Sequence, residues 1–115
     1  MPEEIKNWLG KKVKVVMDRP LGTKHPDKDI ETIYPINYGF IPGTLSSADN
    51  EPIDAYVLGP TQPLKEFEGI VIAGFMREEG DELKLVVTDG RDYSIEEIKK
   101  LTYFQEKYHK SKIYK

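Results

Sequence analysis

The spacing of apolar residues changes once along this chain, and that change limits the folds the chain can adopt. Before Ser94 the apolar residues form short runs or alternate with polar ones, and turn residues separate the runs. After Ser94 the apolar residues recur at every third or fourth position. Alternation with period two is typical of a half-buried strand, whereas the longer spacing is typical of an amphipathic helix. The sequence therefore predicts a strand-rich region followed by one helix.

Five segments before Ser94 are candidate strands. The segment KVKVVMD, residues 12–18, places valines and a methionine opposite lysines, as a strand with one buried face would. AYVLG and LKLVVT are short apolar runs, which suit strands covered on both faces. The remaining two segments are the aromatic stretch YPINYGFIPG and the run GIVIAGFM. We therefore expect strands near residues 12–18, 34–43, 55–59, 69–76 and 83–88.

The segment after Ser94 carries the signals of a helix at both ends. Ser94 followed by Glu97 forms a capping box, in which each side chain bonds the backbone of the other residue. Acids occupy the first turn and bases lie near the expected end, which suits the helix dipole. The sequence predicts one helix over residues 94–110. Its helically spaced apolar residues are Ile98, Leu101, Phe104 and Tyr108.

Together these elements predict a mainly β fold of the α+β type. Five short strands and one covering helix favour a small five-stranded closed β-barrel of OB-like type, because closure removes exposed strand edges. We expect the C-terminal α-helix to pack against the barrel through Ile98, Leu101 and Phe104. We found no internal repeat or linker, so residues 1–115 are expected to form a single domain.

Composition excludes several classes of protein. The chain has no cysteine, which excludes disulfide scaffolds, thiolate metal sites and cysteine nucleophiles and suits the cytoplasm. Its N-terminus begins with acids and lacks a signal-peptide pattern, and its apolar runs are too short to span a membrane. A net charge of −3 gives no general attraction to nucleic acid. We therefore expect no nucleic-acid partner and no membrane partner.

The segment SADNEPIDAY, residues 47–56, concentrates negative charge at a turn. It contains Asp49, Glu51 and Asp54, and no Lys or Arg occurs between Asp29 and Leu64. One interpretation is a solvated turn in which Asp49 bonds its own backbone. The other is a site for a hard cation such as Mg²⁺, which prefers carboxylate oxygens and water. The pattern of residues leaves both interpretations open.

Two strings in this region carry a family resemblance. YPINYGFIPGTL followed by DNEPIDAYVLG resembles the family I soluble inorganic pyrophosphatases, whose hallmark is Y-P-x-N-Y-G-[FY]-I and then D-G-D-P-x-D. Asp49, Glu51 and Asp54 match the three acids of that hallmark. Farther along, EFEGIVIAGFMREEGDELKLVV resembles a segment ending in D-x-K-L-V, and YFQEKYHK resembles the terminal F-F-E-x-Y-K, with His109 at the lysine.

The resemblance implies Mg²⁺-dependent hydrolysis of inorganic pyrophosphate to two phosphates, with Mn²⁺ or another divalent cation as a substitute for Mg²⁺. Bound metal would neutralise phosphate oxygens and lower the pKa of the attacking water. It also implies a homo-oligomer whose substrate is the small molecule pyrophosphate. The implied catalytic residues are Glu51 and Asp54, the metal ligands are Asp49, Asp54 and Glu82, and the substrate-binding residues are Tyr34, Tyr38, Lys84, Tyr108 and Arg19.

Some positions depart from the family pattern and keep two alternatives open. Glu51 stands where the family has Asp, Arg77 stands where it has another metal-binding Asp, and the N-terminal segment is short. Lys14, Arg19 and Lys24 compete as its phosphate-contacting cation. The first alternative is a degenerate module that binds metal and a phosphate compound without efficient turnover. The second is a small barrel that binds single-stranded nucleic acid by stacking bases on tyrosines.

Overall fold

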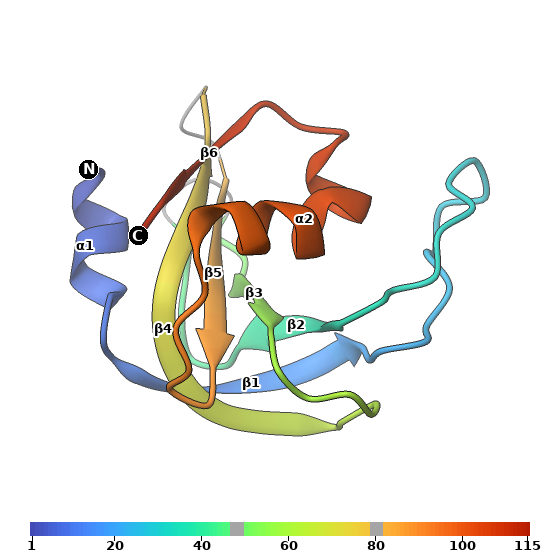
Figure 1. Cartoon of the computed structure of the whole chain (residues 1–115), viewed down its shortest axis with the longest axis horizontal. Helices are drawn as coiled ribbons and strands as arrows, with labels where there is room; N and C mark the ends of the chain where they lie inside the picture. Colours follow the sequence, from blue (N-terminus) through green and yellow to red (C-terminus); the bar gives the residue numbers. More distant parts are fainter. Residues whose placement is uncertain (47–49, 79–81) are drawn as a thin grey trace.

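The structure is a computed structural model that describes residues 1–46, 50–78 and 82–115. Within these residues six strands form one sheet and two helices pack against it (Figure 1). The strands are β1 (Lys12–Arg19), β2 (Asn37–Ile41), β3 (Ile53–Val57), β4 (Glu66–Arg77), β5 (Leu83–Thr88) and β6 (Ser111–Tyr114). The helices are α1 (Glu3–Trp8) and α2 (Ile95–Glu106).

Five of the described strands close into a barrel, as the sequence predicts. Strands β1, β2, β3, β5 and β4 are neighbours in that order, and β4 pairs again with β1. Strands β3 and β5 run parallel, whereas the other neighbours run antiparallel. The twelve-residue β4 permits closure because its first half pairs with β1 and its second half pairs with β5. The expected mainly β barrel with a C-terminal helix is therefore confirmed.

The apolar side chains form two clusters on opposite faces of the sheet. The first cluster draws on all five barrel strands and on Ile5 of α1. The second cluster contains Tyr38 of β2, Tyr56 of β3 and Ile98 of α2. Alternate residues of β3 and β5 point into different clusters, and all six residues of β5 are buried. This burial explains why LKLVVT has a nearly continuous apolar sequence.

Helix α2 differs from the prediction in its length and in its buried face. The capping box of Ser94 and Glu97 is present, but the helix ends at Glu106, before the expected residue 110. Ile98 is fully buried and Phe104 is partly buried, whereas Leu101 is 36% exposed. The role assigned to Leu101 is therefore wrong. Thr102 and Gln105 take the inner positions, because hydrogen bonds within the protein satisfy both side chains.

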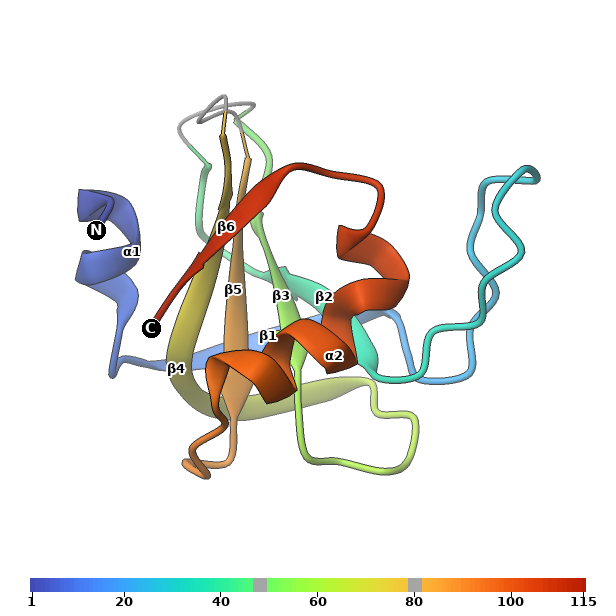
Figure 2. The same ribbon diagram turned by 45° about the horizontal axis from the view of Figure 1, so that its top comes forward.

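Two short elements were not predicted. Helix α1 has six residues and lacks a side-chain cap at Pro2. Strand β6 has four residues and is held by its pairing with the end of β4. Much of the loop between β1 and β2 extends away from the barrel in both views (Figures 1 and 2). Backbone bonds between His25 and Thr32 and between Thr23 and Tyr34 hold this loop together.

Across the described residues, no helix has both the length and the apolar character needed to cross a membrane.

Candidate active site

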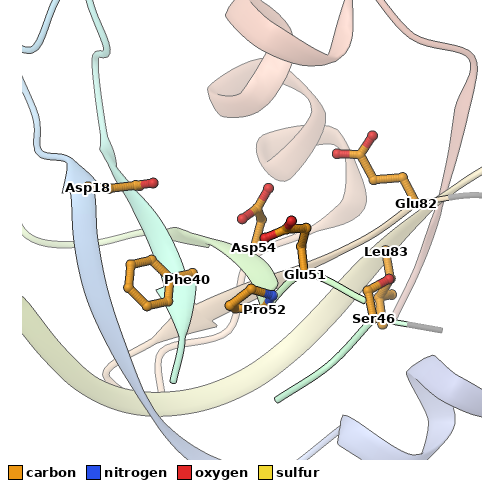
Figure 3. A pocket seen from close by; sticks show the side chains of 8 residues that line it. All are labelled: Asp18, Phe40, Ser46, Glu51, Pro52, Asp54, Glu82 and Leu83. Carbon is orange, nitrogen blue, oxygen red and sulfur yellow. The ribbon is translucent and has the colours of Figure 1, made fainter. Parts of the chain in front are cut away.

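Among the described residues, four carboxylates line one pocket of about 380 Å³ (Figure 3). Asp18 comes from the end of β1, Asp54 from β3, Glu51 from the segment before β3, and Glu82 from the residue before β5. The carboxylates of Asp18, Glu51 and Asp54 point toward a shared space, and Glu82 lies at its side. The other lining residues are Phe40, Ser46, Pro52 and Leu83.

Strand register brings these acids together. Phe40 of β2 pairs with Asp54 of β3 and with Val16 of β1, so β1, β2 and β3 lie side by side at this level. The register of β1 shifts between Met17 and Arg19, which places Asp18 at an irregularity in the strand. Such irregularities redirect a side chain that regular pairing would place elsewhere. Asp18 thereby joins a pocket whose other acids lie more than thirty positions away.

The surroundings of Asp54 disfavour its negative charge. Burial raises the pKa of Asp54 above its ordinary value, and the nearby carboxylates of Asp18 and Glu82 raise it further. A hydrogen bond of 2.8 Å from the Tyr38 hydroxyl and the positive charge of Lys84 act in the opposite direction. Burial also raises the pKa of Tyr38 well above its ordinary value, so this hydroxyl stays a donor. A bound cation would supply the compensation that Asp54 lacks.

Glu82 has a different environment because cations already surround it. Arg77 lies 2.6 Å from one Glu82 oxygen, and the Lys84 ammonium lies 3.8 Å from the other. Arg77 also reaches Nδ1 of His109 at 2.9 Å. Arg77 is the residue that stands where the family has a further acid. Its contact with Glu82 neutralises part of the charge on that side of the pocket.

The predicted cations lie on either side of the tyrosines. Lys84 is nearly buried, pairs in register with Asp54, and places its ammonium 3.0 Å from Glu106. Arg19 donates a hydrogen bond of 2.6 Å to the hydroxyl of Tyr34 and lies over the rings of Tyr34 and Tyr38. Of the three competing N-terminal cations, Arg19 therefore contacts the predicted tyrosines directly. Lys14 instead pairs with Glu66 on the barrel surface.

Among the described residues, the predicted site residues that line the acidic pocket are Glu51, Asp54 and Glu82. Tyr38 and Lys84 contact two of these acids without lining the pocket, whereas Tyr34, Arg19 and Tyr108 do not line it. Tyr108 follows α2, is 50% exposed and stacks with the ammonium of Lys107. It is not among the residues that line the acidic pocket within the described part of the chain. Asp49 lies outside the described residues. The structure brings together Tyr38, Asp54, Glu51, Glu82 and Lys84, and their roles in chemistry stay predictions.

The donor set suits a hard cation, although it is not arranged as a finished site. Among residues 1–46, 50–78 and 82–115, no three His, Cys, Asp or Glu side chains are grouped closely enough to hold an ion. Carboxylate oxygens are the ligands that Mg²⁺ prefers, and Mg²⁺ keeps several waters that can bridge longer gaps. The raised pKa of Asp54 shows that this pocket holds negative charge at a cost. Asp18, Glu51 and Asp54 could therefore hold a divalent cation.

The sequence interpretation missed two residues of this region. Asp18 ends the alternating segment KVKVVMD, and an acid at the end of a strand was a usable signal. Glu106 is the acid of YFQEKYHK and takes the place of the acid in the terminal motif quoted above. The structure adds Asp18 to the pocket and places Glu106 against Lys84.

Comparison with known proteins supports the resemblance. The sequence model of the family described as inorganic pyrophosphatase matches residues 3–114. An inorganic pyrophosphatase of Sulfolobus acidocaldarius is 36% identical over 98 residues, which cover 78% of this chain and 56% of that protein. One of Caulobacter vibrioides is 44% identical over 54 residues, which cover 45% of this chain and 30% of that protein. The chain thus spans only about a third to about half of these relatives.

Solved structures show the same fold. The inorganic pyrophosphatase of Ehrlichia chaffeensis aligns with a TM-score of 0.68 at 17% identity, covering 92% of this chain and 86% of that one. That of Coxiella burnetii aligns with a TM-score of 0.60 at 20% identity, covering 91% and 84%. At this level of identity the structural likeness shows only a shared fold. The match of the family's sequence model to residues 3–114 shows common ancestry. The chain therefore belongs to the inorganic pyrophosphatase family.

Proposed function

We propose that this protein hydrolyses inorganic pyrophosphate to two phosphates with the help of a divalent cation, Mg²⁺ in the first place. The observation that carries the proposal is the pocket of four carboxylates beside Lys84, in a chain of this family. One water attacks one phosphorus atom, the bond from that phosphorus to the bridging oxygen breaks, and the bridging oxygen leaves with the second phosphate. A bound divalent cation would neutralise phosphate oxygens and lower the pKa of the attacking water.

The acids would bind the metal ion and the attacking water, and the cations would bind the phosphates. Asp49, Asp54 and Glu82 would hold the metal, and Asp18 adds a carboxylate that the family resemblance did not point to. Glu51 would accept the proton of the attacking water or orient it, because its side chain lines the same pocket as Asp54. Tyr38 keeps Asp54 in place through its hydrogen bond.

The remaining proposed residues would bind the phosphates. Lys84 and Arg19 would stabilise the charge on the departing phosphate, since a preorganised cation near developing negative charge lowers the barrier. Tyr34 and Tyr108 would add hydroxyl donors. We further propose that residues 1–115 act as a single domain. Assembly into a homo-oligomer and a cytoplasmic location stay predictions.

One observation favours a second candidate, a module that binds metal and a phosphate compound without efficient turnover. Arg77 lies 2.6 Å from Glu82, so an acid of the proposed metal set already has a cationic partner. If this pair persists when the substrate binds, the pocket offers one carboxylate fewer to metal ions. The acidic pocket gives no support to the nucleic-acid alternative, because phosphate backbones need a basic groove.

A phosphate-release assay separates these candidates. The wild type should release two phosphates per pyrophosphate with Mg²⁺ or Mn²⁺, and a chelator should stop the reaction. Asp54→Asn should lower kcat/KM by at least about 100-fold, because mutation of residues that merely support metal ligands already costs about 10- to 100-fold. Asp29→Asn removes the same charge from an exposed position outside the pocket and should retain activity.

The substrate panel should contain pyrophosphate, tripolyphosphate and ATP. A folded wild type that releases no phosphate from any of them, while Mg²⁺ still raises its melting temperature, would contradict hydrolysis and favour the binding module. An Asp54→Asn variant with wild-type activity would show that Asp54 has neither proposed role.

A further inference from the structure

Three polar side chains lie buried between the sheet and α2, within an otherwise apolar cluster. Tyr34 and Tyr56 are fully buried, and Gln105 is 6% exposed. A buried polar group destabilises a protein unless it finds hydrogen-bond partners. These side chains come from the loop before β2, from β3 and from the last turn of α2. Their partners therefore link distant parts of the chain.

The bonds form one continuous chain between two cations. Arg19 donates to the Tyr34 hydroxyl at 2.6 Å, and that hydroxyl donates to Oε1 of Gln105 at 2.6 Å. Nε2 of Gln105 donates to the Tyr56 hydroxyl at 3.0 Å. The Tyr56 hydroxyl in turn donates to Oε2 of Glu106. The same Glu106 oxygen accepts from the Lys84 ammonium at 3.0 Å.

The two ends of this chain are the two cations proposed to bind phosphate, Arg19 and Lys84. Between them lie the consecutive residues Gln105 and Glu106, which belong to the segment YFQEKYHK and do not line the acidic pocket. Each tyrosine hydroxyl donates one bond and accepts another, and the amide of Gln105 uses its oxygen for one tyrosine and its nitrogen for the other. The chain is therefore consistent in its donors and acceptors throughout.

We propose that Gln105 and Glu106, in the last turn of α2, are positioning residues that hold Arg19 and Lys84 in place for the substrate. This inference rests on the proposed function, because it assigns the two cations to phosphate. In this proposal α2 has two roles: it covers the second core cluster, and its last turn holds the side chains of Arg19 and Lys84 in place.

The physical reason is the flexibility of the two cationic side chains. Free Lys and Arg side chains each lose about 2 kcal/mol of rotamer entropy when they are ordered. Here the folded protein orders them before a substrate arrives. A displacement of about 1 Å at a reacting group can lower a rate about 100-fold. Fixing both cations on one helical turn therefore keeps them in a constant relation to each other.

Glu106 is also the nearer acidic partner of Lys84, whose ammonium lies 3.0 Å from Glu106 and 3.8 Å from the pocket acid Glu82. Lys84 pairs in register with Asp54, so without another partner its ammonium could neutralise the acid that the cation needs. Burial raises the pKa of Glu106, but the charge of Lys84 and the bonds from Tyr56 and Lys84 outweigh burial, and the pKa lies below its ordinary value. Glu106 is thus ionised at neutral pH and serves as the counterion.

The test compares two disconnecting variants with a control on the same helix. Gln105→Met keeps a side chain of similar length but breaks the bonds to Tyr34 and Tyr56. Glu106→Gln keeps the shape and removes the charge next to Lys84. Thr102→Ser removes a buried methyl group from α2 and leaves every bond of the chain intact. The binding probe is methylenediphosphonate, a pyrophosphate analogue that cannot be hydrolysed, with Mg²⁺ present.

We expect Gln105→Met to weaken methylenediphosphonate binding about 3- to 10-fold, which corresponds to one neutral hydrogen bond. Glu106→Gln should weaken it about 10- to 100-fold, because its bond to Lys84 is charge-assisted. KM for pyrophosphate should rise by the same factors. Thr102→Ser should lower the melting temperature and leave both binding quantities within about twofold of the wild type. If Gln105 and Glu106 only stabilised the fold, all three variants would show the same changes in melting temperature and in binding.

Four outcomes would overturn the proposal. Unchanged methylenediphosphonate binding in both Gln105→Met and Glu106→Gln would show that the cations need no anchor. Tighter binding in Glu106→Gln would show that the carboxylate only repels the anion. Equal weakening in Thr102→Ser would reduce the effect to helix stability. If the wild type binds methylenediphosphonate without hydrolysing pyrophosphate, the proposed function fails while this comparison still decides the role of Gln105 and Glu106. If the wild type binds no methylenediphosphonate, the positioning proposal fails as well.

Discussion

Asp54 carries a negative charge in a place that is partly closed to water and already rich in acids. Because its pKa is raised, the folded protein holds a proton at Asp54 more readily than the unfolded chain does. The free energy of unfolding of the metal-free protein therefore contains an unfavourable contribution from Asp54 above the ordinary carboxyl pKa. That contribution is absent at lower pH, where Asp54 is protonated in both states.

Asp54→Asn should accordingly stabilise the metal-free protein at neutral pH. Like charges at a partly solvated site repel each other by on the order of 1 kcal/mol, and the variant should gain some fraction of that. The gain should disappear in melts below about pH 3.8. Wild-type protein should gain stability from Mg²⁺, because a ligand that binds only the folded state raises stability by mass action. Equal Mg²⁺ responses in both proteins would mean that Asp54 is not a ligand.

His109 gives the protein a separate dependence on pH. Burial lowers the pKa of His109, and the positive charges of Lys84 and Arg77 lower it further, against smaller opposite effects of Glu106 and Glu82. The folded protein therefore favours the neutral ring, whose Nδ1 can accept from Arg77. A lowered histidine pKa means that stability is present at high pH and decreases as the pH falls through about 6.5.

His109→Gln should flatten this decrease between pH 7.5 and pH 5. Glutamine can still accept a hydrogen bond from Arg77, but it takes up no proton in this range. Denaturant unfolding at several pH values measures the slope. His25→Gln, on the long loop, serves as the matched histidine-to-glutamine control away from Arg77. An unchanged slope in His109→Gln would assign the pH dependence to other groups.

At the scale of elements, the pairing of β1 with β2 determines where the acidic pocket forms. Gly39 sits opposite Met17, and a Cβ at Gly39 would lie 2.0 Å from the backbone oxygen of Val16 and 2.7 Å from the Cα of Met17. No side chain fits there without separating the two strands. Asp18 follows Met17 directly, so the same contact supports the irregularity that turns Asp18 into the pocket.

Gly39→Ala should therefore destabilise the protein and displace Asp18. We expect the free energy of unfolding to fall by about 3 kcal/mol, at the upper end of the usual effect of overpacking. Denaturant unfolding checks this value, and Mg²⁺-dependent stabilisation should weaken in the same variant. A variant with wild-type stability would show that β1 and β2 separate easily, and that the close approach does not position Asp18.

At the scale of the whole molecule, the two core clusters share strands and should unfold together. Strands β3 and β5 contribute alternate residues to both clusters, and β4 contacts α1, β1, β5 and β6. Asn37 adds a link between distant loops, since its side chain accepts from the backbone nitrogens of Leu21 and Leu64 and donates to the carbonyl of Gln62. No described element of the barrel is stabilised on its own.

Unfolding should therefore occur in a single transition, as expected for one small domain. Trp8 is the only tryptophan and lies in α1, so its fluorescence reports on the N-terminal helix. Far-ultraviolet circular dichroism reports on the barrel and α2. The two denaturation curves should coincide. An earlier fluorescence transition would show that α1 detaches before the barrel unfolds and would contradict a single cooperative unit.

Much of the fold follows from local patterns in the sequence. Alternation along residues 12–18, the apolar run LKLVVT and the capping box at Ser94 each depend on residues close together in the chain, and the structure confirms a strand, a strand and a helix start there. The elements that were missed lack such signals. Helix α1 has no side-chain cap, and β6 is only four residues long, so its formation depends on the free edge of β4.

The features of the candidate site likewise fall into those that follow from the sequence and those that depend on the tertiary structure. The sequence by itself determined the residue types, with acids at Glu51 and Asp54, tyrosines before them and a lysine on a later strand, because local motifs carry those identities. Only the tertiary structure decided that Asp18 enters the acidic pocket, that Arg77 neutralises Glu82, and that Gln105 rather than Leu101 faces the core. These contacts join residues from separate elements through strand register and helix rotation. A shift of one residue in a strand reverses the direction of its side chains, and neither register nor rotation is encoded in any short segment alone.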